Sequence, residues 1–307
     1  MTNTAPVNLS GPFHYSQESL SWIKNNAETP DNIPPSSVHI VSWNVDFAAP
    51  FPEERLQGAL SHLQNEVFHC ADGTEPTSCL ILFQEVYANA IVAILENPWI
   101  QTHFFVVPIS DDTWARGVYY GNITLISKKI NVVAVKQLTF LNSMMGRNAL
   151  IVDVLVQLPH DAKTETGILR IANTHLESLR GHGTKVRPVQ LGLAAEALRE
   201  EHLYGGIIAG DMNAIQESDL TTPKDVGLSD AYQGDENDEK GFTWGYQPRC
   251  QFPPARLDKV LYTRRDGLVV AEPKLIGVGV KTVEEHAWLS DHYGMVTTVA
   301  IGTQQNN

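Results

Sequence analysis

The sequence predicts an α/β sandwich. Several segments have the alternating or β-branched composition of strands, namely residues 38–44, 79–86, 119–127, 148–158, 168–176, 205–213, 257–263 and 293–301. Two long segments have helical periodicity instead, residues 53–68 and 188–204, and a weaker helix is expected after Tyr87. Since helices intervene only in places and do not follow every strand, this order favours a sandwich over a regular doubly wound sheet.

The composition is that of a globular protein with ample material for a core. The chain has 307 residues, of which 43% are hydrophobic and 19% charged. Residues 1–36 are polar and contain Pro30, Pro34 and Pro35, so we expect an N-terminal arm with one short helix within residues 17–26. Residues 37–303 are expected to form a single domain.

Composition also limits the location and the partners. No stretch approaches the roughly 20 apolar residues that a membrane span needs, so we expect an intracellular protein, nuclear or cytoplasmic, that does not bind a membrane. The scattered Cys70, Cys79 and Cys250 indicate neither a disulfide framework nor a zinc site. A net charge of -13 disfavours tight non-specific binding to long duplexes, although an acidic chain can still carry a local basic groove.

Polar residues recur where the expected strands end. Side chains at positions i and i+2 share one face of a strand, so each close pair can point into one cleft. Asn, Asp and Gly are also common turn residues, which by itself explains any one pair. Turn preference explains less well why an acid follows the apolar run 79–83, or why two histidines occupy equivalent places. The residues concerned are Asn44, Asp46, Glu85, His175, Glu177, Asp211, Asn213, Asp291 and His292.

Carboxylates, amides and histidines without cysteine suit a hard cation. Mg²⁺ takes few protein oxygens, keeps several waters and bridges to a substrate phosphate. Glu85 would then be the metal carboxylate, and a neighbouring aspartate would orient or deprotonate a water molecule. Histidine and asparagine side chains would donate hydrogen bonds to the phosphoryl oxygens. The pattern therefore predicts phosphoester hydrolysis.

Asp258 lies inside an otherwise apolar strand, where an unpaired carboxylate is costly. It has two interpretations. Asp258 can hold the imidazole of His292, which would fix the ring and raise its pKa so that a cationic histidine faces the transition state. Alternatively, it forms a surface ion pair with Arg256 or Lys259, and such pairs are common.

Six motifs, "SWNVD", "FQEVY", "NTHLES", "AGDMN", "RLDKVLY" and "LSDHYG", occur in one order over residues 40–301. In this order the chain resembles the endonuclease/exonuclease/phosphatase superfamily of divalent-metal phosphodiesterases. Within it, "WNVD", "MMGRN", "THLESLRGHG", "FTW" and "SDHYG" are most similar to the 5′-tyrosyl-DNA phosphodiesterases. The chain departs from that group at Gly146, at Tyr293 and at residues 214–216, which affects substrate detail more than the hydrolytic core.

The resemblance implies a four-layer α/β/β/α sandwich of two packed mixed sheets flanked by helices, with the site at one end. It implies Mg²⁺, with Mn²⁺ able to substitute, held by Glu85 with Asn44 and Asp46 close by. Asp211 would position the attacking water. The other catalytic residues implied are Asn44, Asn213, His175, His292, Asp291 and Asp258.

The resemblance also implies a substrate, DNA carrying a 5′-tyrosyl adduct left by a trapped topoisomerase, entering as a single-stranded end. Hydrolysis would leave a 5′ phosphate and so serve DNA repair, and we expect a monomer. DNA contacts are implied for Arg147, Ser178, Arg180 and Trp244, because an arginine suits phosphates and an aromatic wall suits a base. Arg147 and Trp244 can equally be ion-pair and core residues.

Two other functions are compatible with the motifs. The same hydrolytic core could act on abasic DNA, RNA, a phosphoinositide or a sphingolipid head group. A non-catalytic binding protein of the same fold is a further alternative, and it predicts loss of at least one of Glu85, Asp211 and His292. All three are present.

Overall fold

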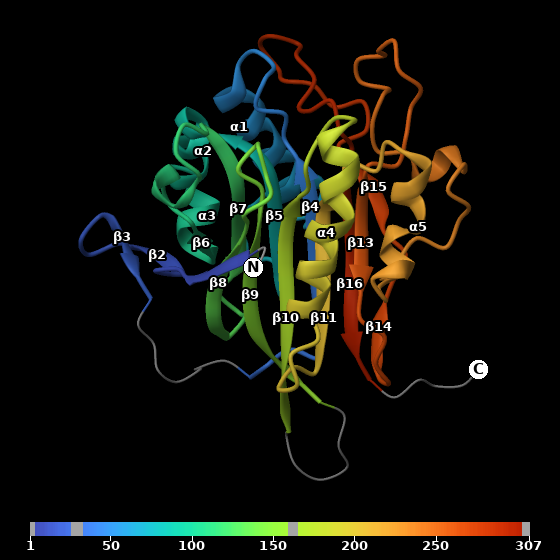
Figure 1. Ribbon diagram of the computed structural model, residues 1–307. Coiled ribbons are helices and arrows are strands. Elements are labelled where there is room, and N and C mark those ends of the chain that lie inside the picture. Colours follow the sequence, from blue (N-terminus) through green and yellow to red (C-terminus); the bar gives the residue numbers. More distant parts are fainter. Residues whose placement is uncertain (1–3, 26–32, 159–164, 303–307) are drawn as a thin grey trace.

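The computed structural model describes residues 4–25, 33–158 and 165–302, and its strands form two sheets (Figure 1). We call them sheet A and sheet B. Sheet A has the order β1 (Thr4–Asn8), β8 (Val132–Phe140), β9 (Asn148–Gln157), β10 (Thr166–His175), β11 (Gly205–Asp211), β13 (Asp258–Tyr262) and β12 (Ser229–Asp230). Sheet B has the order β14 (Leu268–Val270), β16 (Gly294–Ile301), β4 (Ser37–Asn44), β5 (Cys79–Tyr87), β7 (Tyr120–Ser127), β6 (Phe104–Val107), β2 (Phe13–Ser16) and β3 (Ser21–Lys24), with β15 (Lys274–Ile276) also on β16.

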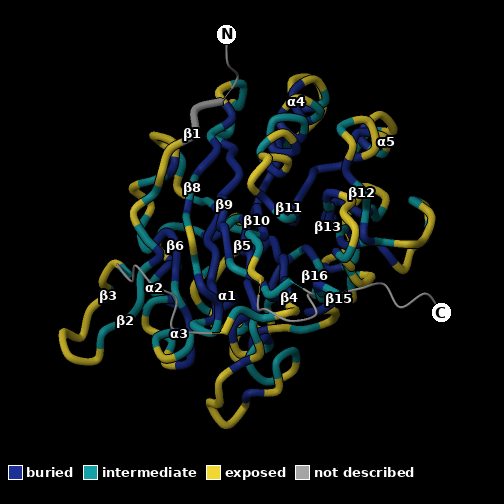
Figure 2. Tube along the Cα trace, turned by 90° about the horizontal axis from the view of Figure 1, so that it is seen from below, coloured by how far each residue is buried: buried dark blue, intermediate teal, exposed yellow. Residues whose placement is uncertain are grey.

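Helices cover the outer face of each sheet, which completes four layers (Figure 2). One layer contains α4 (His182–Ala197) and α5 (Glu217–Asp225). The other contains α1 (Pro52–His62), which continues into a π-helical turn over Leu63–Val67, together with α2 (Ile91–Leu95) and α3 (Pro98–His103). The predicted α/β/β/α sandwich of two mixed sheets is confirmed.

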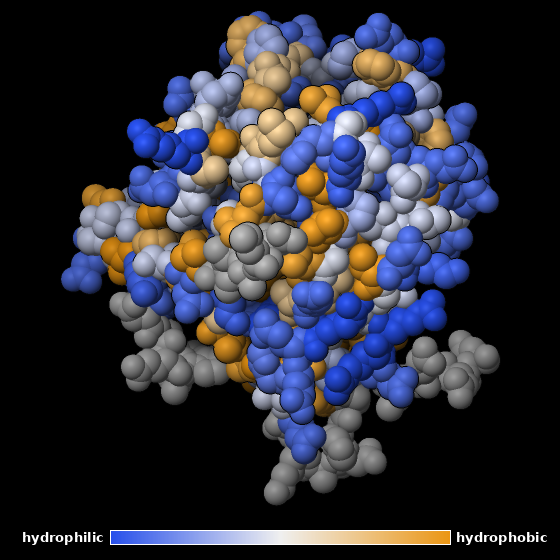
Figure 3. Space-filling view, in the orientation of Figure 1, coloured by the Kyte–Doolittle hydropathy of each residue, from blue (hydrophilic) through white to orange (hydrophobic). Residues whose placement is uncertain are grey.

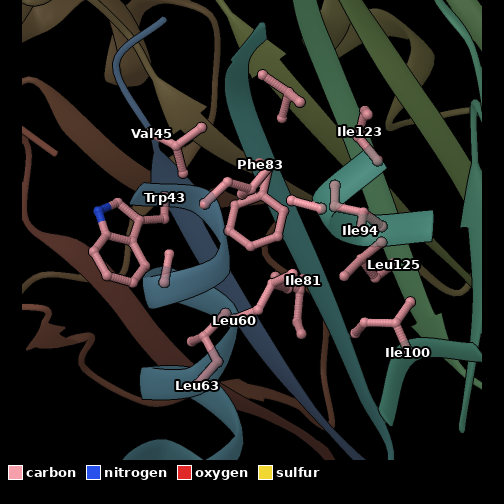
Figure 4. Packing of buried hydrophobic residues seen from close by; sticks show 14 of the residues in the cluster. Trp43, Val45, Leu60, Leu63, Ile81, Phe83, Ile94, Ile100, Ile123 and Leu125 are labelled. Atoms are coloured by element: carbon pink, nitrogen blue, oxygen red, sulfur yellow. The ribbon is translucent and has the colours of Figure 1, made fainter. Parts of the chain in front are cut away.

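The strand sequences explain why the sheets are buried on both faces. In β5, alternate residues face opposite cores: Leu80 and Leu82 pack between the sheets, whereas Ile81 and Phe83 pack against the helices. Figure 4 shows Phe83 near Trp43 of β4 and Leu60 of α1 in this helix-facing core. An apolar run without polar alternation is typical of a strand covered on both sides.

The N-terminal segment differs from the expectation. The helix expected within residues 17–26 is wrong, because β2 and β3 form an antiparallel hairpin that joins sheet B through β6. Ser16 accepts a hydrogen bond from the Ser19 N–H, and Leu20 takes φ 50°, which closes a turn where a helix would continue. β1 pairs with β8 of sheet A. Within residues 1–36, expected to be an arm, the described residues 4–25 thus contribute strands to both sheets.

Other boundaries shift for local reasons. The helix expected at 188–204 begins earlier, at His182, since Pro188 lies inside α4 and does not start it. Strands β6 and β8 and the short helices α3 and α5 were not predicted. In the described residues, no helix is long and apolar enough to cross a membrane. Hydrophilic side chains cover most of the face over α4 and α5 (Figure 3).

A buried ion pair crosses sheet A. Arg170 of β10 and Asp153 of β9 lie opposite each other, and the guanidinium makes two bonds to the carboxylate, 2.6 Å from Nε to Oδ1 and 2.7 Å from Nη2 to Oδ2. Both side chains are almost completely buried. Without Asp153, the buried Arg170 guanidinium keeps, among the described residues, only the half-exposed Glu200 carboxylate, 2.7 Å from Nη1, as an ionic partner. Loss of a buried partner is costly, whereas loss of an exposed pair costs little.

We therefore predict that Asp153→Asn lowers the free energy of unfolding by about 3–5 kcal/mol in urea titrations. The matched control is Glu75→Gln, which removes an exposed bridge to Lys129 and should cost no more than about 1 kcal/mol. Equal losses in the two variants would contradict this account.

Candidate active site

The strand ends that carry the predicted residues meet at one end of the sandwich. β4 runs parallel to β5 in sheet B, and β10 runs parallel to β11 in sheet A, so the carboxyl ends of each pair point the same way. In sheet A, His175 lies opposite Asp211, and Asp211 lies opposite Asp258. Three neighbouring strands therefore present three chemically active side chains side by side.

Asp211 is the centre of this cluster. Its carboxylate accepts hydrogen bonds from Asn44 Nδ2 at 3.0 Å and from the Asn213 N–H at 2.8 Å, and His175 Nε2 lies 3.3 Å away. Burial acts to raise the pKa of Asp211. His175 and the Asn213 N–H, which donate to the carboxylate, and the nearby His292 cation together outweigh burial. They hold the pKa of Asp211 well below its usual range.

The position before Asp211 is a glycine for a steric reason. Gly210 has φ 152°, and a Cβ atom there would lie 1.8 Å from the Thr174 carbonyl oxygen of β10. The backbones of β10 and β11 approach too closely at this point for any side chain. Gly210 therefore allows His175 and Asp211 to lie close enough for their contact.

His175 has a fixed proton position. Arg147 Nη1 lies 2.7 Å from His175 Nδ1, and because a guanidinium has no acceptor, Nδ1 must be the unprotonated nitrogen. The proton is then on Nε2, which faces Asp211. Burial and the Arg147 cation lower the pKa of His175 to about 4, against the attraction of Asp211. The ring is a neutral hydrogen-bond donor.

His292 has the opposite charge state. Its Nδ1 lies 2.7 Å from Asp258 Oδ2, while its Nε2 lies 3.9 Å from Asp211 Oδ2 and 3.8 Å from Asp291 Oδ1. Burial opposes protonation, but these carboxylates outweigh it and raise the pKa of His292 well above its ordinary value. The site thus holds one neutral and one cationic histidine.

The alternative partners of Asp258 are engaged elsewhere. Arg256 donates to Asp230 and Glu236 at 2.8 and 2.6 Å, and Lys259 donates to Glu236 at 3.1 Å. The acidic run 234–241 provides Glu236 for this network. The first interpretation of Asp258, as the partner of His292, is confirmed.

Glu85 reaches the site through an irregularity in β5. The pairing of β5 with β7 shifts between Phe83 and Val86, and Glu85 takes φ 58°, in the left-handed region. Its Oε1 lies 3.7 Å from His175 Nε2, and its Oε2 accepts a hydrogen bond from the Phe47 N–H at 3.2 Å. Burial and the Asp211 carboxylate raise the pKa of Glu85 to about 7, although Arg147 and His292 oppose the rise.

Asn44 and Asp46 lie on the sheet B side. Asn44 Oδ1 accepts a hydrogen bond from the Asp46 N–H at 2.9 Å, and the Asp46 carboxylate caps the following turn by accepting from the Ala48 N–H at 3.0 Å. Burial and Asp291 raise the pKa of Asp46, against Arg55. Asp46 is therefore a partly exposed acid at the rim of the cluster.

The donor set fits a hard divalent cation. Glu85 is a largely buried carboxylate whose pKa is raised by burial and by the neighbouring Asp211 carboxylate, and a bound divalent cation would favour its ionised form. Asp211, Asp258 and His292 can also each offer one ligand atom, and these three atoms lie within 4.8 Å of one another. In that group, however, Asp258 and His292 already neutralise each other, and hard cations prefer oxygen to imidazole nitrogen. Glu85 with Asn44 and Asp46 is the better candidate.

The residues expected to contact DNA divide into two kinds. Arg147 is buried and engaged with His175, with its guanidinium also over the Tyr120 ring at 5.4 Å. Trp244 Nε1 donates to Asp291 Oδ2 at 2.8 Å, which places that ring beside His292. In contrast, Ser178 is half-buried and Arg180 exposed, on the loop between β10 and α4.

Glu177 does not share the cleft with His175. β10 ends at His175, so the two-residue repeat no longer applies beyond it. Glu177 is buried and accepts hydrogen bonds from Ser143 Oγ at 2.6 Å and from the Met144 N–H at 3.0 Å. Its role is to hold the loop that carries Arg147.

Sequence reasoning missed residues that hold the site loops. Arg55 of α1 is buried and donates to the carbonyls of Val45 and Leu289 at 2.9 and 3.0 Å, so it joins the loops that carry Asp46 and His292. No sequence signal distinguished this arginine from an exposed helix residue. Ser290 Oγ donates to the Asn44 carbonyl at 2.6 Å and accepts from the His292 N–H at 3.0 Å. Its place in "LSDHYG" was a signal that could have found it.

Comparisons with known proteins agree with this architecture. Residues 41–292 match the Endonuclease/Exonuclease/phosphatase family. Among solved structures, the chain is similar to TDP2 from Caenorhabditis elegans, with 22% identity and a TM-score of 0.65 over 86% of this chain and 75% of that one. D. rerio TDP2 complexed with single strand DNA product has 19% identity and a TM-score of 0.65, covering 86% and 99%.

An endonuclease/exonuclease/phosphatase family protein from Bacteroides thetaiotaomicron has 15% identity and a TM-score of 0.60, covering 87% of this chain and 98% of that one. At such low identities these likenesses show the shared fold alone. No curated protein matches the chain.

The charge state of His292 gives a prediction. Asp258→Asn removes the carboxylate on Nδ1 and should lower the pKa of His292 toward its ordinary value, since an adjacent opposite charge favours the protonated ring. Ring-nitrogen NMR across a pH titration measures it. Asp291→Asn, whose carboxylate is farther away and partly exposed, should have a smaller effect. An unchanged His292 titration in Asp258→Asn would rule out the pair as the source of the charge.

Proposed function

Since the chain belongs to the endonuclease/exonuclease/phosphatase family, whose members are hydrolytic enzymes, we propose that it is a divalent-metal-dependent phosphodiesterase. The proposed substrate is DNA with tyrosine, or a tyrosine-containing peptide, on its 5′ phosphate. The product would be a free 5′ phosphate, as in the repair of trapped topoisomerase. The observation that carries the proposal is the buried Asp211 carboxylate between a neutral and a cationic histidine.

The side chains suit attack by water on phosphorus. Asp211 orients the water through a hydrogen bond and accepts its proton as the new P–O bond forms. Its lowered pKa makes it a weak base, so orientation is its larger contribution. The cationic His292 faces the negative charge that develops on the phosphoryl oxygens, while the Nε2–H of His175 holds the Asp211 carboxylate in place.

The leaving group needs little assistance. The bond from phosphorus to the tyrosyl oxygen breaks, and the phenolate leaves with the electron pair. A phenol has a pKa of about 10, so its anion leaves without a dedicated general acid. This accords with a site in which Asp211 and His292 already have other roles.

Glu85, with Asn44 and Asp46 beside it, would hold Mg²⁺, with Mn²⁺ able to substitute. A bound divalent cation supplies neutralisation of phosphate charge. Asn213 Nδ2 donates to the Leu176 carbonyl at 3.1 Å, and the second N–H of that amide is directed to the phosphate in this proposal.

Single-stranded DNA is the proposed polymer. The exposed Arg180 and the half-buried Ser178 supply phosphate contacts, and Trp244 supplies an aromatic wall beside His292. The likeness to D. rerio TDP2, whose structure contains single strand DNA product, supports this choice. A different phosphodiester, such as abasic DNA, RNA or a lipid head group, remains the second candidate because the hydrolytic residues would be the same. A non-catalytic role has less support, since the charged cluster is complete.

The proposal predicts hydrolysis of a 5′-phosphotyrosyl oligonucleotide with Mg²⁺, and loss of activity with EDTA. Asp211→Asn should lower kcat by at least about a thousandfold, the scale seen when a principal catalytic group is removed. Release of tyrosine and of the 5′-phosphorylated strand measures the reaction. Cleavage of an abasic or lipid phosphodiester with no cleavage of the tyrosyl substrate would contradict the proposed specificity and leave the family chemistry intact.

Arg147 and Arg180 should have different kinetic effects. Arg147→Met frees His175 Nδ1 to take the proton, so kcat should fall about 10- to 100-fold, as for other residues that orient a functional histidine. Arg180→Met should raise KM and change kcat little, because this exposed side chain contacts DNA away from the phosphorus. Steady-state kinetics separates the two effects. The same pattern in both variants would contradict the separate roles.

A further inference from the structure

We propose that Asn173 of β10 is a positioning residue that clamps the β5 bulge and thereby directs Glu85 into the site. The inference rests on the proposed function, because it explains why Glu85, the proposed metal ligand, points into the site. Asn173 is completely buried and belongs to sheet A, whereas Glu85 belongs to sheet B. Asn173 therefore acts on Glu85 from the opposite sheet of the sandwich.

The bulge decides which way Glu85 points. Ile81 and Phe83 face the helix-covered core of sheet B, and in a regular strand Glu85 would share that face. After the bulge it is Val86 that packs in the helix-facing core. One extra residue in β5 therefore keeps an ionisable side chain out of an apolar core and turns it toward Asp211 and His175.

Asn173 contacts the bulge directly. Its Nδ2 donates to the Phe83 carbonyl at 3.0 Å and to the Ile123 carbonyl at 3.1 Å. Phe83 and Ile123 are the last regular pair of β5 and β7 before the register shifts. A single amide from the other sheet thus holds both strands at the point where the bulge begins.

The acceptor end of the same amide holds the next residue. Asn173 Oδ1 accepts a hydrogen bond from Gln84 Nε2 at 2.8 Å, and Gln84 immediately precedes Glu85. Gln84 Nε2 also lies 3.2 Å from Ser42 Oγ of β4. Since buried polar groups need partners, the donor and acceptor of the Asn173 amide favour one arrangement of residues 83–85, in which, within the described part of the chain, only Gln84 Oε1 of this network is left without a partner.

The test is equilibrium binding of Mn²⁺, followed by electron paramagnetic resonance of the free ion, which needs no substrate. We expect Asn173→Ser to weaken Mn²⁺ binding about 10- to 100-fold, as for other groups that orient a metal ligand. The matched control is Asn122→Ser, a buried asparagine of β7 with an amide that bonds to Asn148 and to the Asn173 carbonyl, at 3.3–3.4 Å. It should retain wild-type affinity within about threefold, because it orients no metal ligand. Circular dichroism confirms folding.

The result that overturns the inference is wild-type Mn²⁺ affinity in folded Asn173→Ser, or an equal loss in Asn122→Ser. If Asn173→Ser does not fold, Asn173→Asp keeps the size and the acceptor for Gln84 while replacing the Nδ2 donor, and the same two outcomes apply. Glu85→Gln separates this inference from the proposed function. If Glu85→Gln binds Mn²⁺ like the wild type, the metal role of Glu85 fails. If only Glu85→Gln loses affinity, the Asn173 inference alone fails.

Discussion

The rest of the site depends on the hydrogen bonds that the buried Asp211 carboxylate accepts. Asp211 belongs to sheet A, yet Asn44 of sheet B donates to it at 3.0 Å, and His292 approaches it from the segment before β16. A buried carboxylate is costly without such donors. The two sheets must therefore pack in one alignment for Asp211 to be ionised, and that alignment also places the candidate catalytic groups.

Three residues of the site have a strained backbone conformation. Asp46, Glu85 and Asn213 all take positive φ, a conformation that costs a non-glycine residue about 1–3 kcal/mol. Asp46 and Asn213 lie two residues beyond the ends of β4 and β11, and Glu85 lies at the bulge within β5. Hydrogen bonds within the cluster offset this strain. In a regular strand Glu85 would be relaxed, but it would then share the helix-facing side of Ile81 and Phe83.

Much of the site was predictable because strand ends are visible in a sequence. Apolar runs end at Asn44, His175 and Asp211, and parallel strands bring those ends together. The Asp258–His292 pair was predictable as one of two options, since a charge within an apolar strand needs a partner. The bulge at Glu85 was not, because strand periodicity assigns that residue to the helix-facing core. The roles of Glu177 and Arg147 depend on loops joined by long-range hydrogen bonds, for which local patterns give no signal.

The central claim is that the two sheets direct water at the phosphorus of a tyrosyl phosphodiester. Hydrolysis in ¹⁸O-labelled water, with mass spectrometry of both products, tests it most directly. The account predicts one ¹⁸O atom in the 5′ phosphate of the DNA and none in the released tyrosine. Label in the tyrosine hydroxyl, or an intact substrate with Mg²⁺ present, would contradict it.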